Sequence, residues 1–257
     1  MTKNNDGLII NNLDKVYPLV TGGTFDTLDN ISLTVNPGEF VSIIGPSGSG
    51  KSTLFNIISG IEQPSAGEIL LNGESIIARK GVISYMPQQD HLLPWRTVID
   101  NIILGLEIKG YSKKESREKA NEYLAVFGLS GFEQQFPHML SGGMRSRAAL
   151  LRTLLLKNEL LLLDEPFSAL DEITRMQMQQ WLLGIWERFK SMVLFVTHSV
   201  DEAIYLSDRI YLFSARPARV VAEFTIDLPR PRAAEVMVTE EFMQYKQEIM
   251  QELAKTL

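Results

Sequence analysis

The sequence predicts an α/β fold in which helices cover a mostly parallel sheet, with an N-terminal antiparallel β subdomain and an inserted α-helical subdomain. Strands and helices alternate through much of the chain, a pattern typical of parallel sheets. Continuous apolar runs such as Leu160–Leu163 and Met192–Val196 indicate strands buried on both faces. The middle of the chain has helical periodicity instead. We therefore divide the chain into an α/β core with its antiparallel subdomain (1–88 and 151–215), a helical subdomain (89–150) and a C-terminal extension (216–257).

The N-terminal part supplies the antiparallel strands and the first parallel strand. Three apolar segments predict the antiparallel sheet: Leu8–Ile10, Ile31–Val35 and Glu68–Leu71. The last of these runs into Asn72-Gly73, a pair typical of two-residue hairpin turns. Phe40–Ile44 is a short run rich in β-branched residues and predicts the first strand of the parallel core.

The inserted region is predicted to contain a well-capped helix. Ser112 and Glu115 have the spacing of a capping box, so the helix should begin there and run to about Phe127. Gly128 follows as a residue that commonly ends helices. The apolar stripe of this helix consists of Ala120, Tyr123, Leu124 and Phe127.

The second half of the chain returns to alternating strands and helices. Ser199 and Glu202 predict a second capping box, and Ile210–Phe213 should be the last core strand. The tail from Ala215 is rich in proline and arginine, and it turns helical at about Glu240. A helix before these elements has one apolar side that we assign to core packing, formed by Met178, Trp181, Leu182, Ile185 and Phe189.

Composition excludes several classes of protein. A net charge of −6 over 257 residues offers no global basic field, so we expect no nucleic-acid partner. The absence of cysteine excludes disulfides, zinc–thiolate sites and cysteine nucleophiles. Met1–Asn12 has no apolar region typical of a secretory signal. The most apolar stretch, Leu150–Leu163, is interrupted by Arg152, Lys157 and Glu159, so we expect membrane contact only through a partner.

A phosphate-binding loop follows the first parallel strand. Small residues allow successive backbone amides to turn toward an anion, and the following helix adds its positive N-terminal end. We expect Lys51 to reach the β- and γ-phosphates of a nucleotide and Ser52 to bind Mg²⁺, with Thr53 also in the nucleotide-binding set. This loop alone does not choose among kinases, GTPases, motors and transporters. The helix should run over Ser52–Ser59 and stop at Gly60. The motif residues are Gly45, Pro46, Ser47, Gly48, Ser49, Gly50, Lys51 and Ser52.

Two carboxylates end a later strand, where ligands of parallel sheets bind. We expect Asp164 to hold Mg²⁺ and Glu165 to polarise a water in line with the γ-phosphate. The alternative is a helix N-cap, which Pro166 would also suit. His198 follows the next buried strand, so its imidazole should lie at the same edge and contact the γ-phosphate.

The segment Leu140-Ser141-Gly142-Gly143-Met144-Arg145 resembles the LSGGQ-type signature of the ATP-binding cassette (ABC) ATPases. The resemblance extends from about Leu8 to Phe213, with the motifs in the family's order. Met144 and Arg145 depart from the commoner Gln-containing ending. The resemblance implies a P-loop (RecA-like) core, ATP hydrolysis with Mg²⁺, and a head-to-tail dimer. In such a dimer, Ser141, Gly142 and Gly143 of one copy cover the γ-phosphate bound by the other.

The same resemblance implies further site residues. Tyr17 is similar to the aromatic residue that stacks on adenine, although a buried tyrosine without a ligand is the alternative. Gln88 is similar to the glutamine that links Mg²⁺ and the attacking water to the helical subdomain, and the neighbouring Gln89 leaves a one-residue ambiguity. Ser168–Asp171 resembles the D-loop, and His198 resembles the switch histidine.

Three classes of protein compete for this sequence: a transporter motor, a soluble ABC ATPase and an unrelated P-loop kinase. Ser141–Gly143 and Glu165 argue against the kinase. Soluble repair ATPases would need a long coiled-coil insertion, and translation ATPases carry paired cassettes. We therefore expect an importer subunit on the inner face of the cell membrane. Its partners would be permease subunits and, indirectly, a solute-binding protein.

Three segments are similar to cassettes of the nitrate/sulfonate/taurine importer group, which includes carriers of pyrimidine precursors of thiamine. They are Leu92–Trp95, Ser214–Pro217 and Asp227–Arg232. In such systems the first segment borders the groove that receives the permease coupling helix. Core packing is the alternative for Trp95, and the transported solute stays open.

Overall fold

The computed structural model describes residues 7–20 and 22–256. Part of Met1–Asn12, the segment searched for a secretory signal, therefore lies outside the described residues, as do the outermost ends of the predicted division. Among the residues that are described, no helix is both long enough and apolar enough to cross a bilayer.

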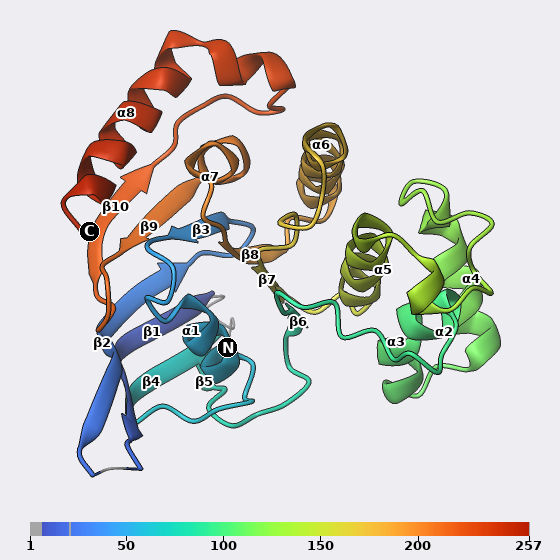
Figure 1. Cartoon of the computed structure of the whole chain (residues 1–257), viewed down its shortest axis with the longest axis horizontal. Helices are drawn as coiled ribbons and strands as arrows, with labels where there is room; N and C mark the ends of the chain where they lie inside the picture. Colours follow the sequence, from blue (N-terminus) through green and yellow to red (C-terminus); the bar gives the residue numbers. More distant parts are fainter. Residues whose placement is uncertain (1–6, 21, 257) are drawn as a thin grey trace, which may run out of the picture.

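The N-terminal antiparallel sheet has the strand order β2-β1-β4-β5 (Figure 1). Its β4–β5 hairpin turns through Asn72 and Gly73, whose φ angles of 51° and 78° are those of the predicted two-residue turn. The expected antiparallel sheet is thus confirmed, with longer strands than the apolar segments alone indicated. The strands are β1 (Leu8–Pro18), β2 (Thr24–Val35), β4 (Ala66–Leu71) and β5 (Glu74–Ser75).

The second sheet has the order β10-β9-β3-β8-β7-β6, and its strands are parallel except for β10 at one edge. Ile210–Phe213 is therefore not the last strand of the core, because β10, in the tail rich in proline and arginine, pairs with β9. The strands are β3 (Phe40–Ile44), β6 (Ser84–Met86), β7 (Leu160–Asp164), β8 (Met192–Val196), β9 (Arg209–Phe213) and β10 (Val220–Thr225).

The parallel sheet separates two apolar layers. On β7, Leu161 and Leu163 belong to the cluster that includes the helices of the second half of the chain, whereas Leu160 and Leu162 belong to the cluster beneath α1 (Lys51–Ile58) and the antiparallel sheet. All four leucines are at most 6% exposed. Each such burial contributes about 1.5–3 kcal/mol, so both faces of β7 hold the fold together.

The inserted helices form a group beside the sheets, at the right in Figure 1. Ser112 and Glu115 make the predicted capping box at the start of α4. This helix ends at Leu124 rather than near Phe127, because the chain turns there and Gly128 takes a left-handed φ of 61°. The elements are α2 (Val98–Ile102), α3 (Leu104–Ile108), α4 (Lys113–Leu124), η1 (Pro137–Met139) and α5 (Gly142–Leu154). Helix α5 continues across the predicted division at residue 150.

The remaining helices cover the core and its C-terminal edge. Helix α6 (Glu172–Phe189) buries Met178 and Leu182 as predicted, but Phe189 is 55% exposed, so its assignment to the core is wrong. Helix α8 (Glu240–Ala254) confirms the helical tail and packs against α7 (Val200–Leu206). The short helix η2 spans Ala234–Val238.

Candidate active site

The predicted site residues gather where the parallel strands end. Gly45 directly follows β3, Asp164 is the last residue of β7, and Gln88 and His198 lie two residues beyond β6 and β8. Because these strands are parallel and hydrogen-bonded side by side, their carboxyl ends share one edge of the sheet (Figure 1).

The phosphate-binding loop wraps from β3 into the N-terminus of α1. Gly48 and Gly50 have φ angles of 74° and 111°, in the left-handed region that favours glycine. A Cβ atom at Gly50 would lie 2.9 Å from Cδ2 of Leu28. Glycine is therefore required at Gly50 for both conformation and space, and the loop can present backbone amides toward an anion.

The Lys51 side chain lies within this loop. Its Nζ atom donates to the carbonyl oxygens of Gly45 and Pro46 at 2.9 and 2.8 Å, and the residue is 7% exposed. Burial lowers the pKa of Lys51, while the nearby charges of Glu165 and Asp164 act to raise it. The ammonium is thus held next to the loop by neutral oxygens that a phosphate oxygen can replace.

Asp164 is a buried carboxylate beside the start of α1. It is 2% exposed, and the Ser52 hydroxyl lies within hydrogen-bonding reach of it. Burial raises the pKa of Asp164, and the Ser52 hydrogen bond and the Lys51 charge oppose that rise. Ser52 and Asp164 therefore present oxygen donors side by side, as a hard divalent cation requires.

Glu165 lies at the centre of a cluster of three polar side chains. Gln88 Nε2 donates to Glu165 Oε2 at 3.1 Å, and His198 Nδ1 lies 3.5 Å from the same oxygen. Glu165 has a φ of 48°, a left-handed backbone conformation that is unfavourable for residues other than glycine. Its backbone N–H donates a hydrogen bond to the carbonyl oxygen of Val196. The fold therefore holds this carboxylate in an unusual backbone conformation, which brings together residues that sequence analysis singled out separately. Gln88, not Gln89, makes the contact with Glu165.

A buried network behind His198 was not foreseen. Ser199 caps α7 as predicted, because its hydroxyl accepts a hydrogen bond from the Glu202 backbone N–H. The Glu202 side chain does not accept from the Ser199 backbone N–H, so the second capping box is only half formed. Glu202 instead accepts from Thr197 Oγ1 at 2.5 Å and from Gln179 Nε2 at 3.0 Å. Burial raises the pKa of Glu202, and the bond from Thr197 opposes that rise.

This network joins two helices that border the site. Arg175 Nε lies 3.8 Å from Glu202 Oε1, so α6 is linked to the residue before His198. The beginning of α6 is capped by Asp171, whose carboxylate accepts from Thr174 N at 3.0 Å. No sequence motif marked Glu202 for this role, because its spacing from Ser199 is also that of a helix cap.

The predicted signature segment begins α5. Ser141 is its N-cap and accepts from Met144 N at 3.3 Å. Arg145 and Arg152 tie this helix to the segment after Gln88, through the Asp90 carboxylate at 3.1 Å and the His91 carbonyl at 2.9 Å. The polar contacts of α5 therefore extend from Ser141 to the residues that follow Gln88.

Tyr17 lies beside the first turn of α1. Its hydroxyl bonds Glu62 and lies near the Thr53 side chain. Burial raises the pKa of Tyr17, and the bond to Glu62 adds to the rise. Tyr17 is only partly buried, and the Lys15 Nζ atom lies 4.6 Å from its ring centre. Its assignment to adenine stacking stays a prediction.

Arg216 is a candidate that the motifs missed. A Cβ atom at Gly48 would lie 3.9 Å from Arg216 Nη2, and the guanidinium carbon lies 4.7 Å from the ring centre of Phe25. Arg216 therefore brings a cation to the outer side of the phosphate-binding loop. It follows β9, far from that loop in sequence, so only the sheet topology reveals it.

Comparison with known families gives a match over residues 28–168 to the model described as ABC transporter. An ABC transporter ATP-binding protein of Methanocaldococcus jannaschii is 46% identical over 95% of this chain and 90% of its own. The aliphatic sulfonates import ATP-binding protein SsuB of Bacillus cereus is 41% identical over 95% of this chain and 94% of its own. The formylaminopyrimidine import ATP-binding protein ThiZ of Halalkalibacterium halodurans is 42% identical over 90% of this chain and 89% of its own.

A solved structure gives the same result for the fold. The dimeric structure of MJ0796, a bacterial ABC transporter cassette, superposes with a TM-score of 0.78 at 31% identity. The superposition covers 86% of this chain and all of that one. A second structure of MJ0796 is of a post-hydrolysis state bound to ADP and Pi, with the same score.

Proposed function

The chain belongs to the ABC transporter family and is an ATPase, and from this premise we propose that it energises the import of a small solute through a partner permease. The observation that carries the mechanism is the position of the Glu165 carboxylate. It lies within 3.5 Å of both Gln88 and His198, at the edge of the sheet that also carries the phosphate-binding loop.

Nucleotide binding is assigned to the loop and its surroundings. The backbone amides of 45 and 47–50 face the phosphates, and Lys51 leaves its carbonyl partners to contact the β- and γ-phosphate oxygens. Thr53 lies in the first turn of α1, and Tyr17 offers its ring to the adenine.

The donor set fits Mg²⁺. Among residues 7–20 and 22–256 there is no group of three or more His, Cys, Asp or Glu that could hold a metal. The fit rests on the neighbouring oxygens of Ser52 and Asp164, because Mg²⁺ takes few protein ligands and completes its shell with water and substrate phosphates. Ser52, Asp164 and Gln88 would hold it. When bound, it would neutralise negative charge on the phosphates.

Glu165 acts as the general base for hydrolysis. Its carboxylate takes a proton from a water that attacks the γ-phosphorus in line, and the bond between that phosphorus and the leaving ADP oxygen breaks. Gln88 and His198 both contact Oε2 of Glu165, so they orient the carboxylate and the water. The His198 imidazole also contacts the γ-phosphate and stabilises the charge that develops there.

A second copy of the chain completes the site. Helix α5 packs in the apolar layer on the opposite side of the sheet from α1. This supports a head-to-tail dimer, in which Ser141, Gly142 and Gly143 of one copy approach the γ-phosphate held by the other. The capped N-terminus of α5 would supply its amides and its positive end to that phosphate.

The partner is a permease in the membrane, fed by a solute-binding protein on the far side. Trp95 supports this, because it is 72% exposed and core packing is therefore wrong for it. The relatives named for aliphatic sulfonates and for formylaminopyrimidine suggest a cargo of the nitrate, sulfonate, taurine or pyrimidine-precursor kind. The chain would then reside in the cytoplasm, on the inner face of the membrane.

Glu165→Gln tests the mechanism. We expect ATP hydrolysis to fall by about 10²- to 10⁴-fold, the usual contribution of a general base, while ATP binding persists. Phosphate release and equilibrium dialysis measure the two quantities. The ATP-bound variant should also elute as a dimer, and adding Ser141→Arg should return it to a monomer. Rapid turnover by Glu165→Gln would remove Glu165 from the role of base.

Association with membranes separates the importer from a soluble ABC ATPase. We expect the chain to copurify with an integral membrane protein from detergent-solubilised source cells, and Trp95→Ala to weaken that association. Ile108→Ala is the matched control, because Ile108 is a similarly exposed apolar side chain of the helical region, at 78%. Recovery of the chain only outside the membrane fraction would favour the soluble alternative.

A further inference from the structure

A cavity lies at the edge of the parallel sheet opposite the nucleotide site. It encloses about 400 Å³ and is lined by Ser84 and Met192, the first residues of β6 and β8. Glu159, which precedes β7, and Gly38, which precedes β3, lie at its border. The nucleotide-site residues follow the other ends of these strands, so the two sites are distinct.

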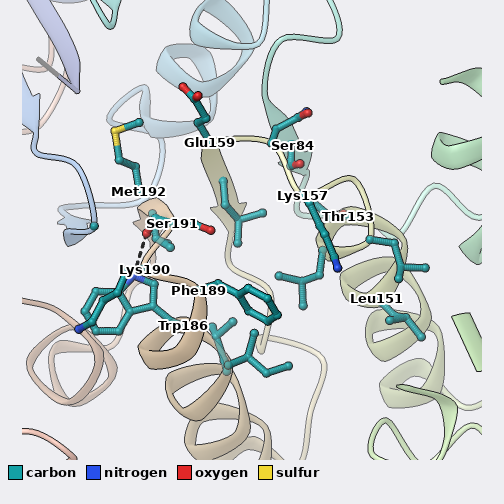
Figure 2. A pocket seen from close by; sticks show the side chains of 18 of the residues that line it. Ser84, Leu151, Thr153, Lys157, Glu159, Trp186, Phe189, Lys190, Ser191 and Met192 are labelled. Atoms are coloured by element: carbon teal, nitrogen blue, oxygen red, sulfur yellow. Dashed lines mark hydrogen bonds between the residues drawn. The ribbon is translucent and has the colours of Figure 1, made fainter. Parts of the chain in front are cut away.

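The walls of this cavity are largely apolar and come from three elements. Leu151 and Leu155 reach it from the end of α5, Leu161 from β7, and Trp186 and Phe189 from the end of α6 (Figure 2). Phe189 is 55% exposed although it continues the apolar side of α6, so it forms part of the open rim. The volume is in the range of small-molecule sites, which are commonly concave and apolar with a few polar groups.

Two polar groups face this apolar space. Ser84 is 2% exposed, and its Oγ has no hydrogen-bond partner among the described residues. Buried hydroxyls without a partner are uncommon, so this one points to a ligand atom. In Figure 2 the Lys157 side chain extends toward the space between Phe189 and Thr153. Its Nζ lies 5.6 Å from the ring centre of Phe189.

The other charges at the border are directed elsewhere. The Glu159 carboxylate accepts from Asn72 Nδ2, and Figure 2 shows it pointing away from Phe189. Lys190 lies over the ring of Trp186 at 4.1 Å, on the side away from Phe189. The described lining residues therefore present the Lys157 cation, the buried unpartnered hydroxyl of Ser84 and largely apolar walls.

We propose that this cavity binds a small organic anion with an apolar body, such as an aliphatic carboxylate or sulfonate. The apolar body lies against the ends of α5 and α6. The anionic group pairs with Lys157 and accepts a hydrogen bond from Ser84, because a charged acceptor gains most from such donors. Nothing in the nucleotide site uses these residues.

The bound anion would act on the signature segment. Helix α5 begins next to Ser141 and ends at the cavity, so one rigid helix joins the two places. A ligand that holds the end of α5 against β7 and α6 opposes any movement of the signature segment toward a second copy. The anion therefore slows ATP hydrolysis, and this consequence rests on the proposed function.

Calorimetric titration of the full chain with octanoate tests the site. We expect saturable binding at one site per chain, with octane-1-sulfonate binding similarly and 1-octanol binding at least about tenfold more weakly, since it lacks the charge. The two anions separate carboxylate from sulfonate preference. Equal affinity for octanoate and 1-octanol would overturn the assignment of an anion site.

Two variants locate the binding. Lys157→Gln should weaken octanoate binding by about tenfold and leave 1-octanol unchanged. Lys190→Gln is the matched control, because Lys190 shares the left-handed backbone (φ 48° against 49°) and should leave both ligands unchanged. Ser84→Ala should weaken octanoate binding without lowering the melting temperature, since no described residue bonds that hydroxyl. Octanoate that binds all variants like the parent refutes the site.

The rate of ATP hydrolysis tests separately whether the bound anion acts on the signature segment. Saturating octanoate should slow ATP turnover by the parent and not by Lys157→Gln. Binding without an effect on turnover would overturn the link through α5. A chain that binds octanoate but never hydrolyses ATP would contradict the proposed function and leave the site standing.

Discussion

The two ends of the parallel strands carry sites of different chemistry, one polar and one largely apolar. At the carboxyl edge lie a glycine loop, a buried lysine and carboxylates, including Glu165 in a left-handed conformation. At the amino edge lie largely apolar walls with the buried unpartnered hydroxyl of Ser84 and with Lys157. Parallel strands bring the positive N-terminus of α1 to the first edge, so it suits a triphosphate. The C-terminal ends of α5 and α6 meet the second edge, so an anion there needs a side-chain cation and apolar contact.

Lys51→Ala gives the largest effect on ATP affinity at the carboxyl edge. We expect ATP affinity to fall by about 10- to 150-fold, because a hydrogen bond to a charged group contributes about 1.5–3 kcal/mol. Equilibrium dialysis with ATP measures the change. Lys80→Ala is the control, since Lys80 is exposed and lies outside the site. Unchanged ATP affinity in Lys51→Ala would refute the phosphate-loop assignment.

Glu202→Gln tests whether the network behind His198 positions the site. We expect turnover to fall by between about 10- and 100-fold, because loss of the charge frees Arg175 and a small misplacement is costly in catalysis. The KM for ATP should change little, since Glu202 does not reach the nucleotide. Glu172→Gln, in the first turn of α6, is the control. A fall in ATP affinity with normal turnover would contradict a positioning role.

The same variant has a predictable effect on stability. Because burial raises the pKa of Glu202 above 4.5, its contribution to stability is present below that value and is lost as pH rises through the raised pKa. Gln does not titrate, so the free energy of unfolding of Glu202→Gln should rise relative to the parent between about pH 4 and pH 7. Urea unfolding at both values measures it. A constant difference would show that Glu202 does not titrate differently in the folded state.

Arg216→Gln should have a smaller effect at the carboxyl edge. Its guanidinium is near the loop but exposed to solvent, and exposed charge pairs contribute about 0–1 kcal/mol. We therefore expect ATP affinity to fall by about two- to fivefold, and the loss to shrink at high salt. Arg219→Gln is the matched control, because Arg219 pairs with Asp29 instead. Equal effects of both variants would remove Arg216 from the nucleotide site.

Phe189→Ala should have the smallest effect on the ligand-free chain. Because Phe189 is 55% exposed, we expect its loss to lower the free energy of unfolding by less than about 1 kcal/mol. Leu182→Ala, on the same helix and 1% exposed, should cost about 2–5 kcal/mol. Chemical denaturation compares the two. Equal losses would mean that Phe189 packs in the core after all.

Local sequence was sufficient where the chemistry is local. The capping box at Ser112 and Glu115, the turn at Asn72-Gly73 and the left-handed Gly60 after α1 appear as predicted. Each depends on residues within a few positions of one another, so neighbouring side chains determine them. The two apolar layers on β7 were likewise predictable, because a strand buried on both faces must be apolar throughout.

Elements that depend on distant partners were predicted less well. The sequence of β10 lies in a tail rich in proline and arginine, and it becomes a strand because β9 offers an unpaired edge. Glu202 has the spacing of a helix cap, yet its carboxylate accepts hydrogen bonds from Thr197 and Gln179. In both cases the deciding contact comes from another element of the fold.

By itself, the sequence determined the α/β class, the phosphate-binding loop and the order of the site motifs, because strand periodicity and loop conformation depend on neighbouring residues. Only the tertiary structure decided which side chains meet. Glu165 contacts Gln88 and His198 because parallel strands end together. Ser84 at the start of β6 and Lys157 between α5 and β7 line one cavity at the opposite edge. Side chains from separate strands become neighbours through hydrogen-bonded register, which no local stretch of sequence contains.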